Sequence, residues 1–271
     1  MIKMTDDEFK LLACYIKENS GINLRAEKKT LLIGRLNNML IDLGMDNFMT
    51  YYNFLLSDTQ GTELSRLIDK VTTNHTYFMR EAEHFNFLTQ TVLPYFRDTI
   101  KNKDFRIWCA ASSTGEEPYT LAILLEEYFK MTGERWDKKL LATDLSLNVL
   151  EYAKKGIYSN DKVNALPKIW ALNYFDKITP LEYQVKRYLR SEVIYRRFNL
   201  LEHVFPFKQK FHVIFCRNVM IYFDIPTKDT LLNKLYDSLE YGGYLFIGHS
   251  ESINRENTRF KYIKPAVYRK I

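Results

Sequence analysis

Cysteine is scarce in this chain of 271 residues, and its three thiols, Cys14, Cys109 and Cys216, lie far apart without a CxxC pair. We therefore expect neither a disulfide framework nor a metal site. This usage is typical of proteins from a reducing cytoplasm. The chain also lacks any apolar run near the roughly 20 residues that a membrane-spanning helix needs, and its N-terminus is polar, unlike a signal peptide. We expect neither secretion nor membrane insertion, and predict a cytoplasmic protein.

Glycine is also rare, with ten residues in the whole chain. The apolar segment FRIWCA breaks into the loop ASSTGEEPYT, which contains a single glycine. A turn between a buried strand and a helix can hold a nucleotide-like ligand, but this one lacks the GxGxxG fingerprint of dinucleotide-binding proteins. We therefore expect a different adenosine-containing cofactor.

The chain has a modest excess of positive charge, with a net charge of +6. The surplus of basic residues lies beyond His75, since the part before it is close to neutral. A basic surplus favours an acidic partner, which is either nucleic acid or an acidic protein surface. Charge alone does not decide between these two classes of partner.

The N-terminal part of the chain has the apolar spacing of helices. Thr5 and Glu8 stand at the positions of a capping box, and apolar residues then recur at helical spacing until Gly21. Further stripes of the same period predict helices over about 25–43, 48–56 and 64–71. We therefore predict that residues 1–72 form a small all-helical domain, followed by an interdomain segment over 73–84.

Beyond a helical stretch over 83–100, apolar strands alternate with amphipathic helices. Strands are predicted over 105–109, 140–143, 212–216 and 244–247, and helices over 118–130, 147–154 and 227–239. This alternation predicts that residues 85–271 form an α/β domain with a mostly parallel sheet, which binds ligands at the carboxyl ends of its strands. Two additions are predicted: a small antiparallel sheet inserted at about 174–198, and an antiparallel edge strand within 260–271.

Asp144 ends the predicted strand KKLLATD. An acidic side chain at such a strand end commonly accepts hydrogen bonds from ribose hydroxyls. The same side chain could instead cap the helix that follows. Both interpretations remain open for this residue taken by itself.

Six segments of the chain together resemble a known family. They are TTNHTYFMRE, ASSTGEEPYT, ATDLS, RRFNLL, FCRNVMIYFD and GGYLFIGHSES, in this order. Together they resemble the CheR-type chemotaxis receptor methyltransferases over essentially the whole chain. The resemblance implies an S-adenosylmethionine-dependent methyltransferase domain of Rossmann-like fold with a small antiparallel sheet insertion, preceded by an all-helical domain. It also implies methylation of receptor glutamates, with S-adenosylhomocysteine as the second product.

The resemblance implies a role for several side chains. Arg80 and Tyr222 are implied to lie near the transferred methyl group. The implied cofactor-binding residues are Asn74, Thr76, Arg80, Glu116, Asp144, Asn199, Leu200, Arg217 and Asn218. A glutamate with a pKa of about 4.3 is already ionised at neutral pH, so it can attack a sulfonium methyl group without a general base. The enzyme then has to align the reacting atoms, for which Arg80 and Tyr222 offer suitable donors.

The resemblance also implies a receptor-binding surface on the second helix. Its basic residues Arg25, Lys28, Lys29 and Arg35 are implied to contact the cytoplasmic helical domain of methyl-accepting chemotaxis receptors, and Lys28 and Arg35 are predicted to share a face. An ordinary solvated face is the alternative. The inserted sheet is the family's docking element for a receptor tether peptide. Here its turn, DKITPLEY, is short and lacks a glycine-rich loop, which argues against tether binding.

Other functions compete with this interpretation. The basic composition suits a methyltransferase of nucleic acid, but the chain has no NPPY-like segment for an extruded base. Methylation of another acidic protein is a further alternative. A cofactor-binding interaction module without turnover would be expected to lack Arg80 or Tyr222, and both are present. We therefore expect a receptor as the partner, and no nucleic acid.

Overall fold

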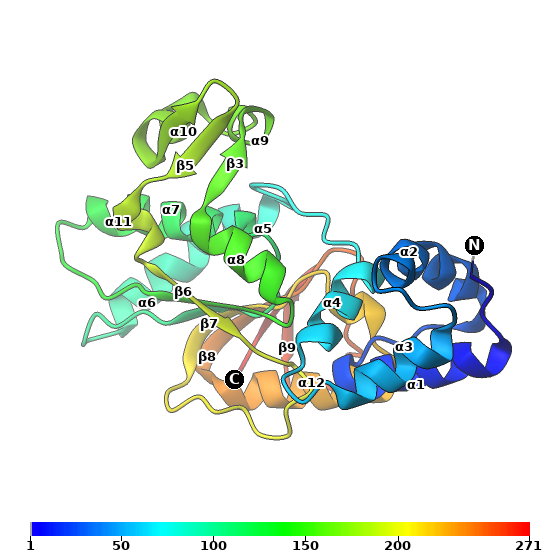
Figure 1. Ribbon diagram of the computed structural model, residues 1–271. Coiled ribbons are helices and arrows are strands. Elements are labelled where there is room, and N and C mark those ends of the chain that lie inside the picture. The colour runs from blue at the N-terminus through cyan, green and yellow to red at the C-terminus, as the bar shows by residue number, and fades with distance from the viewer. Residues whose placement is uncertain (1) are drawn as a thin grey trace.

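The computed structural model describes residues 2–271 and consists of a helical N-terminal part beside a larger α/β part (Figure 1). The N-terminal part contains the helices α1 (Asp6–Ser20), α2 (Lys29–Asp42), α3 (Phe48–Ser57) and α4 (Thr62–Val71). Their apolar stripes meet in one core that includes Leu12, Leu36 and Tyr51. No helix among residues 2–271 is long and apolar enough to cross a membrane.

Helix α1 begins and ends where the sequence predicts. The side chain of Thr5 accepts a hydrogen bond from the backbone N–H of Glu8, and the Glu8 carboxylate accepts one from the N–H of Thr5. This reciprocal capping box satisfies two donors that a helix start leaves without partners. Gly21 ends the helix with φ of 76°, a left-handed conformation that glycine adopts without a steric penalty. Glu8 also accepts from the N–H of Met49, which ties α1 to α3.

The second helix begins later than predicted. Residues Ala26–Lys28 form a short 3-10 turn, η1, and the α-helix starts only at Lys29. The apolar stripe of α2 is buried as expected, with Leu32, Leu36, Met39 and Leu40 at most 2% exposed. Burial of this stripe stabilises the helix, because an isolated helix of this length is marginal in water.

The α/β part is built on a sheet of seven strands in the order β6-β2-β1-β7-β8-β10-β9. The first five of these run parallel: β6 (Val193–Arg197), β2 (Leu140–Asp144), β1 (Ile107–Cys109), β7 (Phe211–Phe215) and β8 (Leu239–Phe246). The chain moves outward from β1 to β2 and later returns to β7 on the other side of β1. Ligands of open parallel sheets bind at such a reversal, outside the carboxyl ends of the strands.

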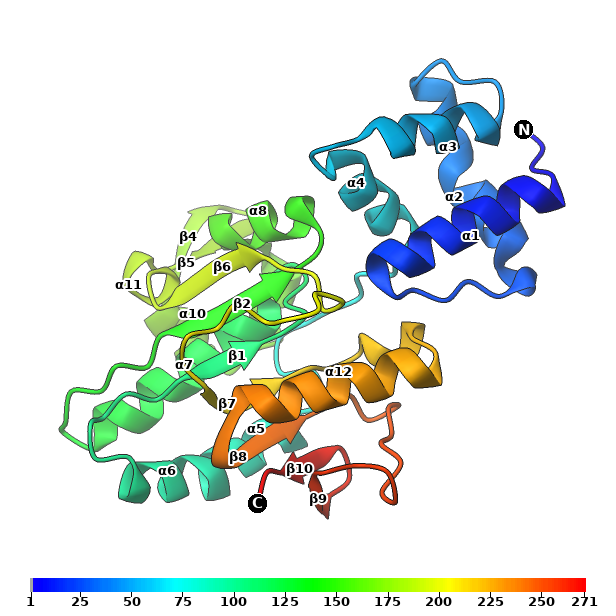
Figure 2. The same ribbon diagram turned by 90° about the horizontal axis from the view of Figure 1, so that it is seen from below.

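Helices cover both faces of this sheet (Figure 2). On one face lie α7 (Glu116–Met131) and a continuous helical stretch formed by α5 (Glu83–Phe87), the π-turn η2 (Leu88–Val92) and α6 (Leu93–Thr99). On the other face lies α12 (Ile225–Ser238). Successive residues of β1 therefore pack into different cores, Ile107 against the first group of helices and Trp108 against α12. Coverage of both faces explains why these strands read as unbroken apolar runs.

The C-terminal stretch forms two strands instead of one. Strands β9 (Lys261–Lys264) and β10 (Val267–Arg269) form an antiparallel hairpin, and β10 pairs with β8. The turn contains Ala266, with φ of 60°. The predicted antiparallel addition to the sheet is therefore confirmed, with β9 as its edge.

The small inserted sheet differs from the prediction. It consists of β3 (Ile157–Ser159), β5 (Glu182–Val185) and β4 (Phe175–Thr179), in that order, accompanied by α9 (Asn160–Asn164), α10 (Lys168–Tyr174) and α11 (Arg187–Arg190). The prediction that residues 193–197 belong to this sheet is wrong, because β6 pairs in parallel with β2 at the edge of the large sheet. An edge strand covered on one face alternates in polarity much like a strand of a small antiparallel sheet, so the pattern did not separate them.

Buried histidines should make the protein sensitive to mild acid. Burial lowers the pKa of His84 to about 3. Unfolded histidine titrates near pH 6.5, so between these values the unfolded state binds more protons and stability falls as pH falls. His84→Phe keeps a ring of similar size without a titrating group. The unfolding free energy of the wild type should therefore fall relative to His84→Phe between about pH 6.5 and 5, by up to about 1.4 kcal/mol per pH unit.

Urea unfolding of both proteins at several pH values measures this difference. A parallel pH dependence in the two proteins would contradict the prediction. His203→Asn removes an exposed histidine and serves as the control, which should follow the wild type.

Candidate cofactor-binding site

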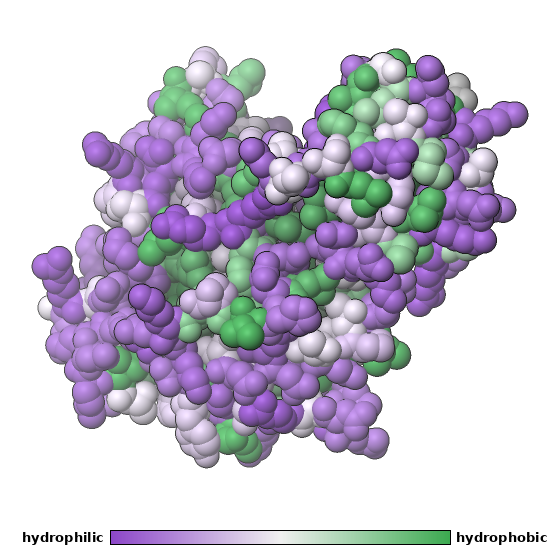
Figure 3. All heavy atoms as spheres, turned by 60° about the horizontal axis from the view of Figure 1, so that its bottom comes forward, coloured by the Kyte–Doolittle hydropathy of each residue, from purple (hydrophilic) through white to green (hydrophobic). Residues whose placement is uncertain are grey.

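A cavity of about 300 Å³ lies at the carboxyl ends of β1, β2 and β7. Its wall is built by the end of α1, by residues of the segment 72–80 that follows α4, and by the loops that follow these strands and β6. In the space-filling view the helical part stands as a separate lobe, with a hollow between it and the rest of the molecule (Figure 3). The cavity is therefore at the place where ligands of parallel sheets bind, closed on one side by the helical part.

Asp144 ends β2 and lines this cavity. Its carboxylate accepts hydrogen bonds from the backbone N–H groups of Ser113, at 2.9 Å, and Ser146, at 3.0 Å. Helix α8 (Leu147–Lys155) is capped by the hydroxyl of Ser146, which accepts from the N–H of Val149. Asp144 is therefore not the residue that caps this helix. Burial raises the pKa of the Asp144 carboxyl, and the two backbone donors oppose this rise.

The loop between β1 and α7 passes close to other backbone. Gly115 has φ of 97°, and a Cβ atom there would lie 2.7 Å from the hydroxyl oxygen of Tyr158. A side chain at this position would therefore be both strained and in collision. This accounts for the single glycine in the loop, whose residues Ser112 and Ser113 line the cavity.

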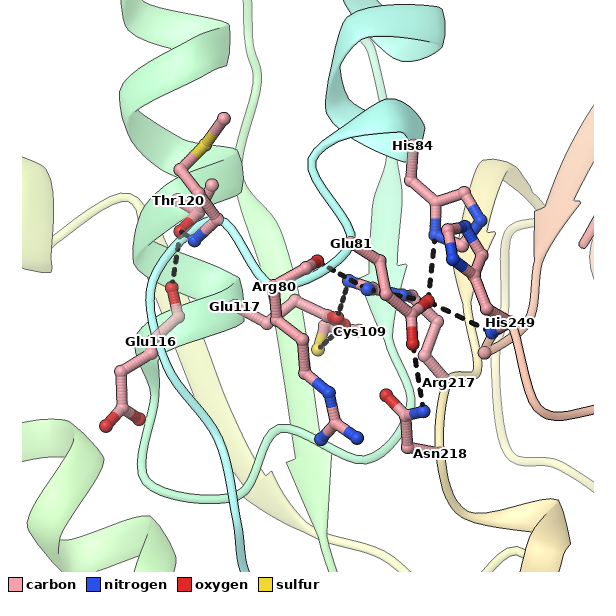
Figure 4. Close-up of polar contacts among 12 residues, drawn as sticks. Arg80, Glu81, His84, Cys109, Glu116, Glu117, Thr120, Arg217, Asn218 and His249 are labelled. Atoms are coloured by element: carbon pink, nitrogen blue, oxygen red, sulfur yellow. Dashed lines mark hydrogen bonds and ion pairs between the residues drawn. The ribbon is translucent and has the colours of Figure 1, made fainter. Parts of the chain in front are cut away.

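The two glutamates that open α7 have different surroundings. Glu116 is fully buried and pairs with Lys162 at 2.5 Å, and it is not part of the cavity lining. Glu117 lines the cavity, accepts a hydrogen bond from the thiol of Cys109 at 3.0 Å, and pairs with Arg217 at 2.5 Å. The structure therefore contradicts the placement of Glu116 at the site and brings Glu117 there instead (Figure 4). Consecutive residues of a helix point about 100° apart, and the sequence EE does not reveal which one faces the ligand.

Arg217 follows β7 and lies between two carboxylates. Its guanidinium pairs with Glu117 at 2.5 Å and with Glu81 at 3.0 Å, and it also donates to the carbonyl oxygen of Arg80 at 2.5 Å. Burial opposes its charge, but the two carboxylates raise its pKa further. Its side chain is only 1% exposed, so removal of either partner would leave a buried charge poorly compensated.

The interdomain segment contributes Asn74, Thr76 and Arg80 to the lining, as the resemblance implies. The guanidinium of Arg80 donates to the carbonyl oxygen of His75 at 2.6 Å. Its neighbours Met79 and Glu81 have φ of 60° and 58°, which is the left-handed region. Arg80 is therefore held in a strained turn at the wall of the cavity.

The opposite wall carries the remaining implied residues. Tyr222 ends the 3-10 turn η3 (Met220–Tyr222), and its hydroxyl oxygen lies 3.4 Å from the backbone nitrogen of Thr73. Asn199 and Leu200 follow β6, and the Asn199 amide donates to the carbonyl oxygen of Asn19 at 2.8 Å, near the end of α1. Asn218, with φ of 57°, completes the wall beside Arg217.

The four basic residues of the second helix do not form one open face. Arg35 donates to the carbonyl oxygens of Val71 and Thr72 at 2.5 and 3.0 Å, at the C-terminal end of α4. Lys29 pairs with Asp6 at 2.6 Å. Lys28 lies in the 3-10 turn directly before α2. Of the four residues, Arg25 and Lys28 are exposed, whereas Lys29 and Arg35 are partly buried.

The cavity has the polar groups that a polar cofactor requires. The hydroxyl oxygens of Ser112 and Ser113 and the Nε atom of Arg217 are buried and have no hydrogen-bond partner among residues 2–271. All three residues line the cavity. Because buried polar groups in native proteins are nearly always satisfied, these atoms indicate that a ligand with several donors and acceptors fits here.

Comparison with known proteins gives the family. Residues 7–72 match the family model described as "CheR methyltransferase, all-alpha domain", and residues 74–269 match "CheR methyltransferase, SAM binding domain". The chain is 44% identical to the chemotaxis protein methyltransferase of Borreliella burgdorferi, over 99% of this chain and 96% of that protein. It is 35% identical to the one of Salmonella typhimurium, over 98% and 91% of the two chains.

Solved structures similar to this chain include the glycopeptide N-methyltransferase MtfA complexed with S-adenosylmethionine. The similarity covers 59% of this chain and 53% of that chain, with 14% identity and a TM-score of 0.32. The family models and the relatives cover nearly the whole chain, and the cavity offers a polar ligand the groups it needs. The protein therefore belongs to the CheR family of chemotaxis protein methyltransferases, and its cofactor is S-adenosylmethionine.

Proposed function

We propose that this enzyme transfers the methyl group of S-adenosylmethionine to glutamate side chains on the cytoplasmic helical domain of methyl-accepting chemotaxis receptors, and that it acts in the cytoplasm. The observation that carries the proposal is that Arg80 and Tyr222 line the same cavity as the strand-end carboxylate of Asp144. A donor pair near a cofactor cavity suits a carboxylate substrate, because an arginine and a tyrosine can both donate hydrogen bonds to it.

The chemistry needs orientation more than acid–base catalysis. The bound cofactor supplies a methyl group activated by a positively charged sulfur. A substrate glutamate is ionised at neutral pH, with a pKa of about 4.3, so no protein group has to remove a proton from it. Arg80 and Tyr222 orient this carboxylate toward the methyl group, and alignment alone can lower the barrier by several kcal/mol. The products are a glutamate methyl ester and S-adenosylhomocysteine.

The remaining lining residues are proposed to bind different parts of the cofactor. Asp144 accepts hydrogen bonds from the ribose hydroxyls, and Asn199 and Leu200 flank the adenine. The methionine end is held by Asn74, Thr76, Arg80, Arg217 and Asn218. Glu117 takes the place that the sequence analysis gave to Glu116, because it is the glutamate that lines the cavity.

Receptor binding is proposed to involve Arg25 and Lys28. The segment before them borders the cavity: Ile22 lines it, and the N–H of Asn23 donates to the carbonyl oxygen of Tyr222 at 2.8 Å. Two exposed cations beside the cavity can attract the acidic methylation region of a receptor. No receptor contact is proposed for Lys29 and Arg35. Lys29 pairs with Asp6, and Arg35 donates to the carbonyl oxygen of Val71 at the end of α4.

Reversing these charges should weaken receptor methylation. The double variant Arg25→Glu/Lys28→Glu is expected to lose about fivefold in kcat/KM per contact, since exposed ionic contacts contribute up to about 1 kcal/mol each. Added salt should slow the wild type in the same way, because it screens such contacts. Lys208→Glu reverses an exposed charge just before β7, at the strand end opposite the cavity, and serves as the control.

The readout is the initial rate of methylation at subsaturating receptor, together with the dissociation constant of S-adenosylhomocysteine. The cofactor affinity should stay unchanged in the double variant. If the double variant methylates receptor like the control, or if a receptor C-terminal pentapeptide competes strongly with receptor, the inserted sheet and not this surface binds the substrate.

The proposed function is tested with labelled S-adenosylmethionine and two membrane preparations, one containing chemotaxis receptors and one from cells that lack them. Label should enter only the receptor band of the first preparation. Label in nucleic acid, or equal label in both preparations, would show that the substrate is another molecule.

A further inference from the structure

We propose that Glu81 is a positioning residue for methyl transfer, which fixes the turn that carries Arg80 by tying it to the loops after β7 and β8. The proposal rests on the proposed role of Arg80 in aligning the substrate. No role was predicted for Glu81 from the sequence, and Glu81 does not line the cavity.

The Glu81 carboxylate joins three segments of the chain. One oxygen, Oε2, forms an ion pair with the Arg217 guanidinium at 3.0 Å and accepts a hydrogen bond from the backbone N–H of His249 at 3.1 Å. The other oxygen, Oε1, accepts from the side-chain amide of Asn218 at 3.2 Å. Arg217 and Asn218 follow β7, and His249 follows β8, so one carboxylate connects both loops to the interdomain segment (Figure 4). Burial alone would raise its pKa, but the charge of Arg217 lowers it, so the carboxylate stays ionised.

The turn around Arg80 requires such a support. Met79 and Glu81, on either side of Arg80, have φ of 60° and 58°, and Asn218 has φ of 57°. A left-handed residue other than glycine is strained, and such conformations persist only where surrounding contacts enforce them. Charge-assisted hydrogen bonds and ion pairs are strong enough to do so.

The position of the Arg80 side chain depends on this turn. The hydrogen bond of its guanidinium goes to the carbonyl oxygen of His75, in the same segment, while its backbone carbonyl accepts from Arg217. No ion pair within residues 2–271 involves the Arg80 guanidinium. If the contacts of Glu81 were lost, the turn could relax, and the guanidinium would move with it.

A metal site is the alternative role for the same residues. Potential ligand atoms of Glu81, His84 and His249 lie within 4.8 Å of one another, and both nitrogens of the buried His84 lack hydrogen-bond partners among residues 2–271. A divalent cation on Oε2 of Glu81, however, would lie beside the guanidinium of Arg217, which is 3.0 Å from that oxygen. Repulsion between these two charges disfavours the metal, and the contacts of Glu81 therefore favour a positioning role.

The test compares Glu81→Gln, Glu81→Ala and Glu81→Gly in the full chain with saturating cofactor and receptor. Each variant should lose at least about tenfold in single-turnover rate, because misplacement of a reacting group by about 1 Å can cost about a hundredfold. Glu81→Gly should be more stable than Glu81→Ala, since glycine tolerates the left-handed turn, yet equally slow. Glu83→Gln, an exposed neighbour in the same segment, is the control and should keep the wild-type rate.

A double-mutant cycle identifies the route of the effect. In an Arg80→Ala background, Glu81→Gln should change the rate less than about twofold, because its effect passes through Arg80. The dissociation constant of S-adenosylhomocysteine, measured by calorimetry on the same variants, needs no receptor. Glu81→Gln should weaken this binding more with Arg80 present than without it, and the loss that remains without Arg80 comes from Arg217 and Asn218, which Glu81 also contacts.

Three outcomes would overturn the proposal: wild-type rates in the Glu81 variants, equal losses with and without Arg80, or Zn²⁺ binding at micromolar concentration that His249→Ala abolishes. A wild-type protein that methylates no receptor would instead contradict the proposed function and leave the calorimetric cycle to decide on Glu81.

Discussion

Replacing Asp144 with alanine is expected to weaken the binding of S-adenosylmethionine by about 10- to 100-fold. The expected loss corresponds to charge-assisted hydrogen bonds, which contribute about 1.5–3 kcal/mol. Asp144 lines the cavity at the end of β2, and its two backbone donors, Ser113 and Ser146, leave acceptor capacity on both oxygens. Isothermal titration calorimetry with S-adenosylhomocysteine measures the change directly.

The control for this variant must separate lost binding from lost stability. Asn47 caps α3 by accepting from the N–H of Thr50, and it is not part of the cavity lining. Asn47→Ala should destabilise the protein by about 1 kcal/mol without changing cofactor affinity. Wild-type affinity in folded Asp144→Ala would reduce Asp144 to a structural link between two loops.

The second large effect concerns the two residues proposed to align the substrate. Arg80→Ala should lower both the rate of methyl transfer and the affinity for cofactor, because Arg80 lines the cavity and is proposed to contact the methionine end of the cofactor. Tyr222→Phe should lower the rate by about 10- to 100-fold, equivalent to a hydrogen bond to a charged group of about 1.5–3 kcal/mol, while cofactor affinity changes little. Among residues 2–271 its hydroxyl makes only long hydrogen bonds to Thr73, at 3.4 and 3.5 Å, and so is free to reorient toward a substrate.

Single-turnover measurements with saturating cofactor separate chemistry from binding in these variants. Tyr241→Phe removes a hydroxyl from a tyrosine that is 78% exposed and lies outside the cavity, so it should behave as the wild type. Transfer at the wild-type rate in both Arg80→Ala and Tyr222→Phe would exclude the proposed alignment.

Local signals in the sequence predicted much of the fold. The capping box of Thr5 and Glu8 and the glycine at position 21 are local sequence signals, and α1 begins and ends at these positions. The central strands are short apolar runs. Strands β1, β2 and β7 lie at those runs, whereas β8 begins at Leu239, before its predicted run over 244–247. Each of these features depends on contacts between near neighbours in sequence or on burial of a whole element, which composition reveals.

Features that depend on contacts between residues far apart in the sequence were not predicted. The strand β6 was assigned to the inserted sheet, because its alternation of buried Val193 and Tyr195 with exposed Ile194 does not say which strand lies beside it. Arg35 was expected to contact a receptor beside Lys28, but its side chain is partly buried and donates to a carbonyl oxygen at the end of α4. No pattern in the sequence indicates that Arg35 donates to the carbonyl oxygen of Val71 at the end of α4.

The same limit applies to predicting the cofactor site from the sequence. Glu116 and Glu117 are adjacent and chemically identical, and only the packing of α7 against Lys162 on one side and Arg217 on the other distinguishes them. No sequence pattern indicated the contacts of Glu81, because its partners Asn218 and His249 lie 137 and 168 residues away in the sequence. The motif TTNHTYFMRE nevertheless includes Glu81, directly after Arg80.

The central claim is that the acceptor of the methyl group is a carboxylate, and the stability of the product in base tests it most directly. Receptor labelled from S-adenosylmethionine is divided into two portions, and one is treated with mild alkali. A glutamate methyl ester hydrolyses and releases its label as volatile methanol, whereas a methyl group on nitrogen remains on the protein. We expect nearly all of the label to be released, with the remaining peptides carrying unmodified glutamate. Label that survives the alkali would contradict the account.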